Sequence, residues 1–141
     1  MKNPIATIYL MLAGLLLLAI GGAILLAPHA FHASNGIELG NNPTMLSEIR
    51  APGGLLAASA VLALISVFRR RLRAFTTPLL VLIFGSFGLA RLVSMAQDGI
   101  PGGSIVGATV LELIVAAIGI AILCRQQAAA DSRLAVPAAP H

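Results

Sequence analysis

The chain has 141 residues, of which 58% are hydrophobic and only 10% are charged, and its formal net charge is +4. A soluble domain usually carries about 25% charged residues, so this composition excludes an ordinary soluble protein. The basic residues lie mostly in short segments beside apolar runs, which argues against nucleic acid as a partner. We expect an all-α integral membrane protein, a four-transmembrane-helix bundle formed as one domain over residues 1–124.

The first predicted span covers residues 5–27, an apolar run that Pro28 ends. About 20 residues cross a hydrocarbon core of ~30 Å. The run is longer than the ~7–15 residues of a signal-peptide core, which favours a retained helix over a cleaved leader. In the connection that follows, residues 30–34 are expected to form a short interfacial turn, with Phe31 directed toward lipid.

The second predicted span covers residues 44–68. Asn42 followed by Pro43 is typical of a helix N-cap and first helical position. Pro52 falls inside the span, where it lacks an N–H and clashes with the carbonyl of Glu48 four residues earlier. We therefore expect a kink next to the charged residues of this helix.

The third and fourth spans are predicted over residues 77–96 and 104–124. A basic hairpin, residues 69–73, connects the second span to the third, and residues 97–103 form the turn before the fourth. The Ala- and Pro-rich tail, residues 125–141, is expected to be disordered and cytoplasmic.

The distribution of basic residues predicts the orientation. Four spans place both ends of the chain on the same side as the hairpin. That side carries seven positive residues, Lys2, Arg69, Arg70, Arg71, Arg73, Arg125 and Arg133. The connections over residues 28–43 and 97–103 contain no Lys or Arg. The positive-inside rule then predicts cytoplasmic N and C termini.

Polar side chains within or beside the apolar spans form the candidate site. The predicted cluster, either ligand-binding or structural, consists of Glu48, Arg50, Arg91, Ser94, Asp98 and Glu112. Helix rise puts Arg91 about 9 Å and Glu112 about 12 Å below the outer membrane surface. An unpaired charge at the centre of a membrane helix costs about 2.5–3.5 kcal/mol or more, so these residues need partners or a function.

Two interpretations of this cluster stay open. In the functional one, Arg50 and Arg91 bind an anionic or carbonyl-bearing group at a site open to the periplasm. In the structural one, Arg91 pairs with Glu112 and Arg50 with Glu48, and the pairs fix the helix register. Close helix approach is expected at small residues, including Gly54-x-x-x-Ala58.

Other chemistry has weak support in the sequence. His29, His32 and Glu38 are loosely spaced and make a poor metal site, so no metal is predicted. Cys124 is the only cysteine, which excludes an intrachain disulfide. No catalytic motif is present, and we predict no catalytic residue and no cofactor.

Several motifs carry a resemblance to a known family. The most specific is residues 48–54, Glu-Ile-Arg-Ala-Pro-Gly-Gly, accompanied by residues 88–94, 98–101 and Glu112. On these the chain resembles the small bacterial membrane proteins of domain of unknown function 4345, from about Tyr9 to Leu123. The resemblance implies four membrane helices and no established activity. It extends distantly to DoxX-like proteins, some of which are linked to quinone-dependent redox chemistry.

Our leading hypothesis is a non-enzymatic protein that binds a small amphipathic ligand or lipid, or acts as an accessory subunit, with the lipid bilayer as its surroundings. The alternative is a membrane enzyme or redox partner acting on a quinone or lipid, with Glu48 or Glu112 carrying protons and Arg91 orienting the substrate. A transporter would need a homo-oligomer or a membrane partner subunit, because four helices alone enclose no pathway.

Overall fold

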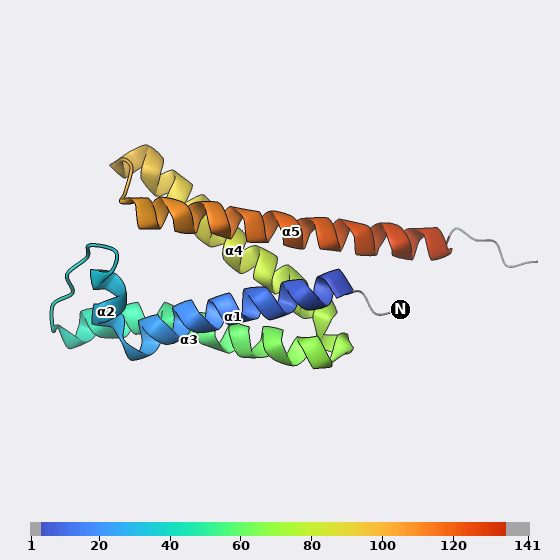
Figure 1. Cartoon of the computed structure of the whole chain (residues 1–141), viewed down its shortest axis with the longest axis horizontal. Coiled ribbons are helices and arrows are strands. Elements are labelled where there is room, and N and C mark those ends of the chain that lie inside the picture. The colour runs from blue at the N-terminus through green and yellow to red at the C-terminus, as the bar shows by residue number, and fades with distance from the viewer. Residues whose placement is uncertain (1–3, 135–141) are drawn as a thin grey trace, which may run out of the picture.

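The computed structural model describes residues 4–134, which are helical except at the connections. The long helices are α1 (Pro4–Leu26), α3 (Pro43–Phe68), α4 (Arg70–Asp98) and α5 (Gly103–Leu134), and the short helix α2 (Pro28–Ala33) lies between α1 and α3 (Figure 1). Each long helix is long and apolar enough to cross a membrane. This confirms the predicted all-α class with four membrane-spanning helices.

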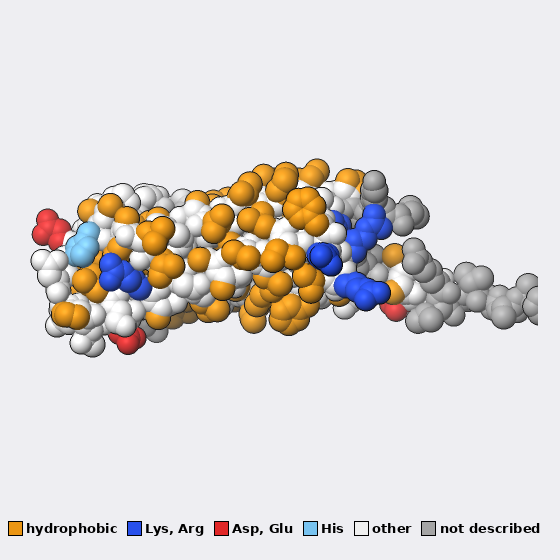
Figure 2. Space-filling model, turned by 90° about the horizontal axis from the view of Figure 1, so that it is seen from below, with side chains coloured by type: hydrophobic (Ala, Val, Ile, Leu, Met, Phe, Trp, Pro, Cys, Tyr) orange, Lys and Arg blue, Asp and Glu red, His pale blue; other side chains and the backbone are white. Residues whose placement is uncertain are grey.

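The helices are arranged as two pairs. α1 packs chiefly against α3, and α4 against α5, whereas α3 meets α4 less extensively and α1 meets α5 only slightly. The start of α1, the α3–α4 junction and the end of α5 lie at one end of the bundle, and α2 with the α4–α5 turn lies at the other (Figure 1). We call these the basic end and the α2 end. On the face seen in Figure 2, hydrophobic side chains cover the middle of the bundle, and most of the arginine side chains in view lie toward the basic end.

The α1–α3 contact is close because glycines face it. A Cβ added at Gly21 of α1 would lie 2.6 Å from the backbone N of Ala57 and 2.8 Å from the carbonyl O of Gly53. Gly54 has open space where its Cβ would be, and Ala58 is exposed. The predicted Gly54–Ala58 contact face was therefore wrong by one residue, since in the structure the neighbouring pair Gly53 and Ala57 faces α1.

The start of α3 follows its sequence signals. The Asn42 side chain accepts hydrogen bonds from the backbone N–H of Thr44 (2.9 Å) and of Met45 (3.3 Å), and Pro43 takes the first helical position. The N-cap prediction is confirmed, because this amide oxygen satisfies N–H groups that have no partner within the helix. Pro52 lies inside α3, so the charged residues that precede it are helical and do not belong to a loop.

Two predicted boundaries differ from the structure. The hairpin over residues 69–73 is reduced to Arg69, whose backbone angles (φ −109°, ψ 89°) separate the helices, and α4 starts at Arg70. Arginine is a good helix former, so the basic run joins the helix. Residues 125–134 continue α5 where a disordered tail was predicted, since this stretch is rich in alanine, the best helix former. Residues 135–141 lie outside the described part of the chain.

Candidate functional site

The α4–α5 hairpin brings Arg91 and Glu112 together. Arg91 Nε donates to both carboxylate oxygens of Glu112, at 3.1 Å to Oε2 and 3.4 Å to Oε1. The Arg91 side chain is 32% exposed and that of Glu112 is 11% exposed. The helices approach closely at Gly88, where an added Cβ would lie 2.7 Å from Leu113 Cδ2. The structure forms the pair that was expected from helix rise.

A cavity of about 60 Å³ adjoins this pair. Three phenylalanines line it, Phe31 of α2 and Phe84 and Phe87 of α4, together with leucine and isoleucine side chains of α1, α3 and α4. Arg91 and Glu112 complete the lining, so the cavity has an apolar wall and one charged side. The terminal nitrogens Nη1 and Nη2 of Arg91 make no hydrogen bond to any residue in the range 4–134. The guanidinium therefore keeps donors for a further group.

Phe31 was misplaced by the sequence reasoning. It was expected to contact lipid, but α2 folds back over the bundle and Phe31 lines the Arg91 cavity, half-buried beside His32. The hydrogen bond between His32 Nδ1 and the carbonyl O of Pro28 (2.9 Å) helps to hold this short helix. No periodicity in a connection of this length indicates which way an aromatic ring will turn.

Arg50 and Glu48 do not pair with each other. Arg50 Nε donates to the carbonyl O of Leu25 (3.2 Å), one of the last carbonyls of α1, which lack partners within that helix. Glu48 is exposed, and Arg91–Glu112 is the one ion pair among the side chains that the structure describes, those of residues 4–132. The predicted Arg50–Glu48 pair was therefore wrong: residues two apart on a helix point in different directions, and Arg50 reaches the end of α1.

Arg50 lines a different hollow from Arg91. It borders an open cleft of about 610 Å³ formed by the end of α1, the loop at Asn41 and the first turns of α3. Ser94 and Asp98 form a third group, in which Ser94 Oγ donates to Asp98 Oδ2 (3.0 Å) on the exposed surface of α4. The six predicted residues therefore do not form one cluster. Arg91 and Glu112 pair beside the cavity, Arg50 contacts the end of α1, Glu48 is exposed, and Ser94 and Asp98 form a separate exposed pair.

A second polar group, at the basic end, was missed. Arg73 donates to the carbonyl O of Ser66 (2.9 Å), the carbonyl O of Val67 (2.6 Å) and Thr7 Oγ1 (2.9 Å), so it joins α4 to the end of α3 and to α1. The Ser66 and Thr76 hydroxyls are hydrogen-bonded at 2.7 Å beside it. The sequence signal was present: an arginine one turn after a helix end can satisfy its last carbonyls.

Metal chemistry finds no support in the part of the chain that the structure describes. Within residues 4–134, no three His, Cys, Asp or Glu side chains are grouped so that they could hold a metal ion. His32 is engaged with a backbone carbonyl, and Cys124 is exposed near the basic end of α5.

Comparison with known proteins identifies the family of the chain, and the function of that family is unknown. The family model described as Domain of unknown function (DUF4345) matches residues 5–123, and the chain belongs to this family. No curated protein matches the chain. No solved structure matches it either.

Proposed function

We propose that this DUF4345 protein binds a small amphipathic molecule in a bacterial inner membrane, with a carbonyl group of the ligand on Arg91 and its apolar part in lipid. The observation that carries the proposal is the cavity beside Arg91, which joins three phenylalanine rings to a guanidinium with two uncommitted nitrogens. Ligand sites are commonly apolar hollows with a few polar groups that fix orientation. Arg91 supplies the orienting group.

The size of the cavity limits what enters it. About 60 Å³ accommodates a head of a few atoms, because a water molecule takes about 30 Å³ of liquid volume. In this proposal the rest of the ligand extends past Phe87, whose side chain is 36% exposed on the bundle surface. This shape fits an amphipath whose polar head is small and whose tail is apolar.

The charge of Glu112 favours a ligand with a neutral head over one with an anionic head. Its carboxylate already balances the Arg91 charge at 3.1 Å. A second anion beside Arg91 would leave one negative charge uncompensated in a poorly hydrated site, which is costly. A neutral carbonyl accepts from the free guanidinium nitrogens without that penalty. An ester, ketone or quinone head fits better than a carboxylate head.

The same contacts favour binding over proton transfer. Both carboxylate oxygens of Glu112 accept from Arg91, and Glu48 is exposed outside the cavity. Neither carboxyl group stands free beside the space that a ligand would occupy. The alternative function, an enzyme or redox partner that moves protons through these residues, lacks a supporting observation.

Thermal unfolding of the purified protein tests the proposal. Methyl laurate, which carries an ester carbonyl, should raise the Tm in detergent, whereas dodecane should not. A ligand at 100 times its Kd stabilises the folded state by about 2.7 kcal/mol. The double variant R91L/E112L, which lacks the arginine without leaving a lone charge, should lose the methyl laurate effect. The R50Q variant, altered at the other arginine of the α2 end, should keep it.

Two results would contradict this function. Equal Tm shifts with methyl laurate and dodecane would show that the protein binds the hydrocarbon part alone and that the ester carbonyl contributes nothing. A larger shift with laurate anion than with methyl laurate would refute the neutral head.

We also propose that both termini are cytoplasmic. Seven Lys and Arg residues fall to the side of the termini and the α3–α4 junction, and none to the opposite connections. A reporter that is active only in the periplasm should be active when fused after residue 36 or 100, and silent after residue 71 or 135. Activity after residue 71 would reverse the orientation.

A further inference from the structure

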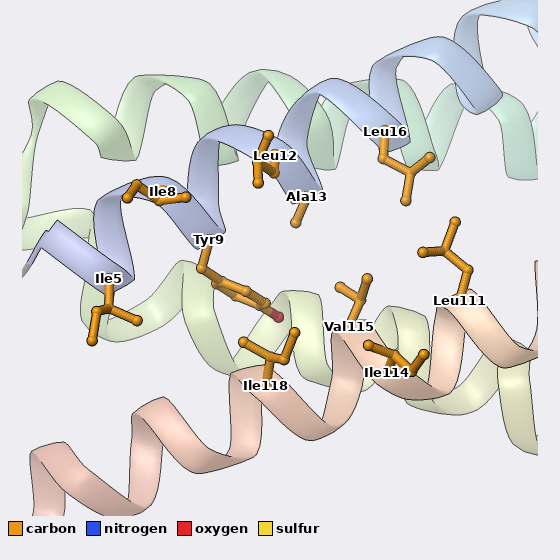
Figure 3. Close-up of a pocket in the computed structure, with 10 residues that line it drawn as sticks. All are labelled: Ile5, Ile8, Tyr9, Leu12, Ala13, Leu16, Leu111, Ile114, Val115 and Ile118. Carbon is orange, nitrogen blue, oxygen red and sulfur yellow. The ribbon is translucent and has the colours of Figure 1, made fainter.

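A groove runs between α1 and α5 toward the basic end of the bundle. Its longer part, of about 400 Å³, extends from Ile5 to Leu16 on α1 and from Leu111 to Ile118 on α5 (Figure 3). A second hollow of about 420 Å³ continues it and shares Ile5 and Ile118 with the first. The groove exists because α1 packs on α3 and α5 on α4, so that these two helices meet only slightly.

The long part of the groove is almost wholly apolar. Ten residues line it, of which nine are isoleucine, leucine, valine or alanine. The tenth is Tyr9, whose ring forms part of the wall between α1 and α5 while its hydroxyl points toward α5 (Figure 3). Most of the wall residues remain exposed on the bundle surface, including Ile8, Leu12 and Ile114 at 52%, 59% and 51%. Hydrocarbon is the chemistry that fits such a wall.

The second hollow, which continues the groove, has a positive charge at its end. Arg125 lines the second hollow with Ile5 and Ile118. Its side chain is exposed, and it makes no hydrogen bond or ion pair with the side chains described, those of residues 4–132. The groove is therefore apolar along its length and basic at one end, which is the complement of an anionic phospholipid. Basic pockets between membrane helices bind such headgroups.

The length of the apolar part agrees with this occupant. Ile5 and Leu16 are eleven residues apart, which is about 16 Å along α1. Half of a hydrocarbon core of ~30 Å is about 15 Å, the depth that one acyl chain fills in its leaflet. Along α5, Arg125 lies seven residues beyond Ile118, a distance of about 10 Å that the second hollow spans. A headgroup and glycerol backbone held there would place the start of an acyl chain beside Ile5 and Ile118, and that chain would then end near Leu16.

We propose that this groove binds a phospholipid with an anionic headgroup, whose phosphate contacts Arg125 and one of whose acyl chains lies between α1 and α5. This site is separate from the Arg91 cavity and does not depend on the function proposed for it. A transmembrane helix of a second copy fits less well. Helix contacts in membranes are formed by small residues, and Ala13 is the one small side chain in the long part of the groove.

The chain carries its own probe for this site. Tyr9 is the only tyrosine and tryptophan is absent, so the intrinsic fluorescence reports on the groove. Phospholipids with brominated acyl chains quench this fluorescence when a chain lies against the ring. In mixed detergent and lipid micelles, brominated phosphatidylglycerol should reach half-quenching at about a fivefold lower mole fraction than brominated phosphatidylcholine. One basic residue near a membrane surface has an effect of this size.

Two variants, each with a matched control, test the headgroup contact and the acyl-chain contact separately. R125Q should abolish the preference for phosphatidylglycerol and leave quenching by phosphatidylcholine unchanged. R70Q, at an exposed arginine of the same end outside the groove, should keep the preference.

I114F narrows the groove and should weaken quenching by both lipids. I120F changes an equally exposed isoleucine of α5 that does not line it, and should not weaken quenching.

Three results would overturn the proposal. Equal quenching of the unaltered protein by the two lipids would refute the headgroup contact. An unchanged preference for phosphatidylglycerol in R125Q would refute it as well. Absence of quenching, together with a dimer in native mass spectrometry that I114F dissociates, would assign the groove to a second copy of the chain.

Discussion

Removing either member of the Arg91–Glu112 pair should destabilise the bundle, but not by equal amounts. Arg91→Leu leaves a carboxylate whose side chain is only 11% exposed, and breaking a buried pair in this way costs about 3–5 kcal/mol. Glu112→Leu leaves an arginine that is 32% exposed. Its long side chain can carry the guanidinium toward the α2 end and water, so we expect a smaller loss of about 1–3 kcal/mol.

The double variant R91L/E112L measures the coupling between the two residues. It leaves no lone charge, and leucines fill similar space, so we expect it to lie within about 1 kcal/mol of the unaltered protein. The coupling free energy from the double-mutant cycle should then be at least ~3 kcal/mol. Unfolding by sodium dodecyl sulfate in mixed micelles gives these free energies, with Tyr9 fluorescence and circular dichroism as the two signals.

Two outcomes would refute this reasoning. Equal losses for the two single variants would mean that the exposure of the remaining charge does not set the cost. Additive losses in the double variant would mean that the Nε–Oε2 contact at 3.1 Å contributes no interaction free energy.

Two further predictions use matched positions. Arg73→Ala removes three hydrogen bonds that join α4 to α3 and α1, and should lower the unfolding free energy by about 2–3 kcal/mol, whereas Arg70→Ala should change it by no more than about 0.5 kcal/mol in the same assay. Gly21→Ala places a methyl group 2.6 Å from the α3 backbone and should cost about 1–3 kcal/mol, whereas Gly22→Ala, which has open space, should be neutral or stabilising. Equal effects in the first pair would contradict the contribution of the Arg73 hydrogen bonds, and equal effects in the second would contradict the close packing of α1 on α3.

The amino-acid sequence by itself determined the local and one-dimensional features of this protein. Four apolar runs of sufficient length require helices, because lipid leaves backbone N–H and C=O groups no other partner. The Asn42 cap acts within a few residues of itself, and the Arg91–Glu112 pair follows from helix rise in a hairpin with a short turn. Such features depend on neighbours in the chain, so pattern and spacing predict them.

Only the tertiary structure decided which partner each polar group meets across the bundle. Arg50 contacts the end of α1 rather than Glu48, Arg73 joins three helices, and Phe31 turns into the cavity beside Arg91. Helix rotation also selected Gly53 over Gly54 as the contact with α1, a difference of one residue or about 100° around the axis. The α1–α5 groove depends on how the two helix pairs are set against each other, and no single segment encodes that arrangement.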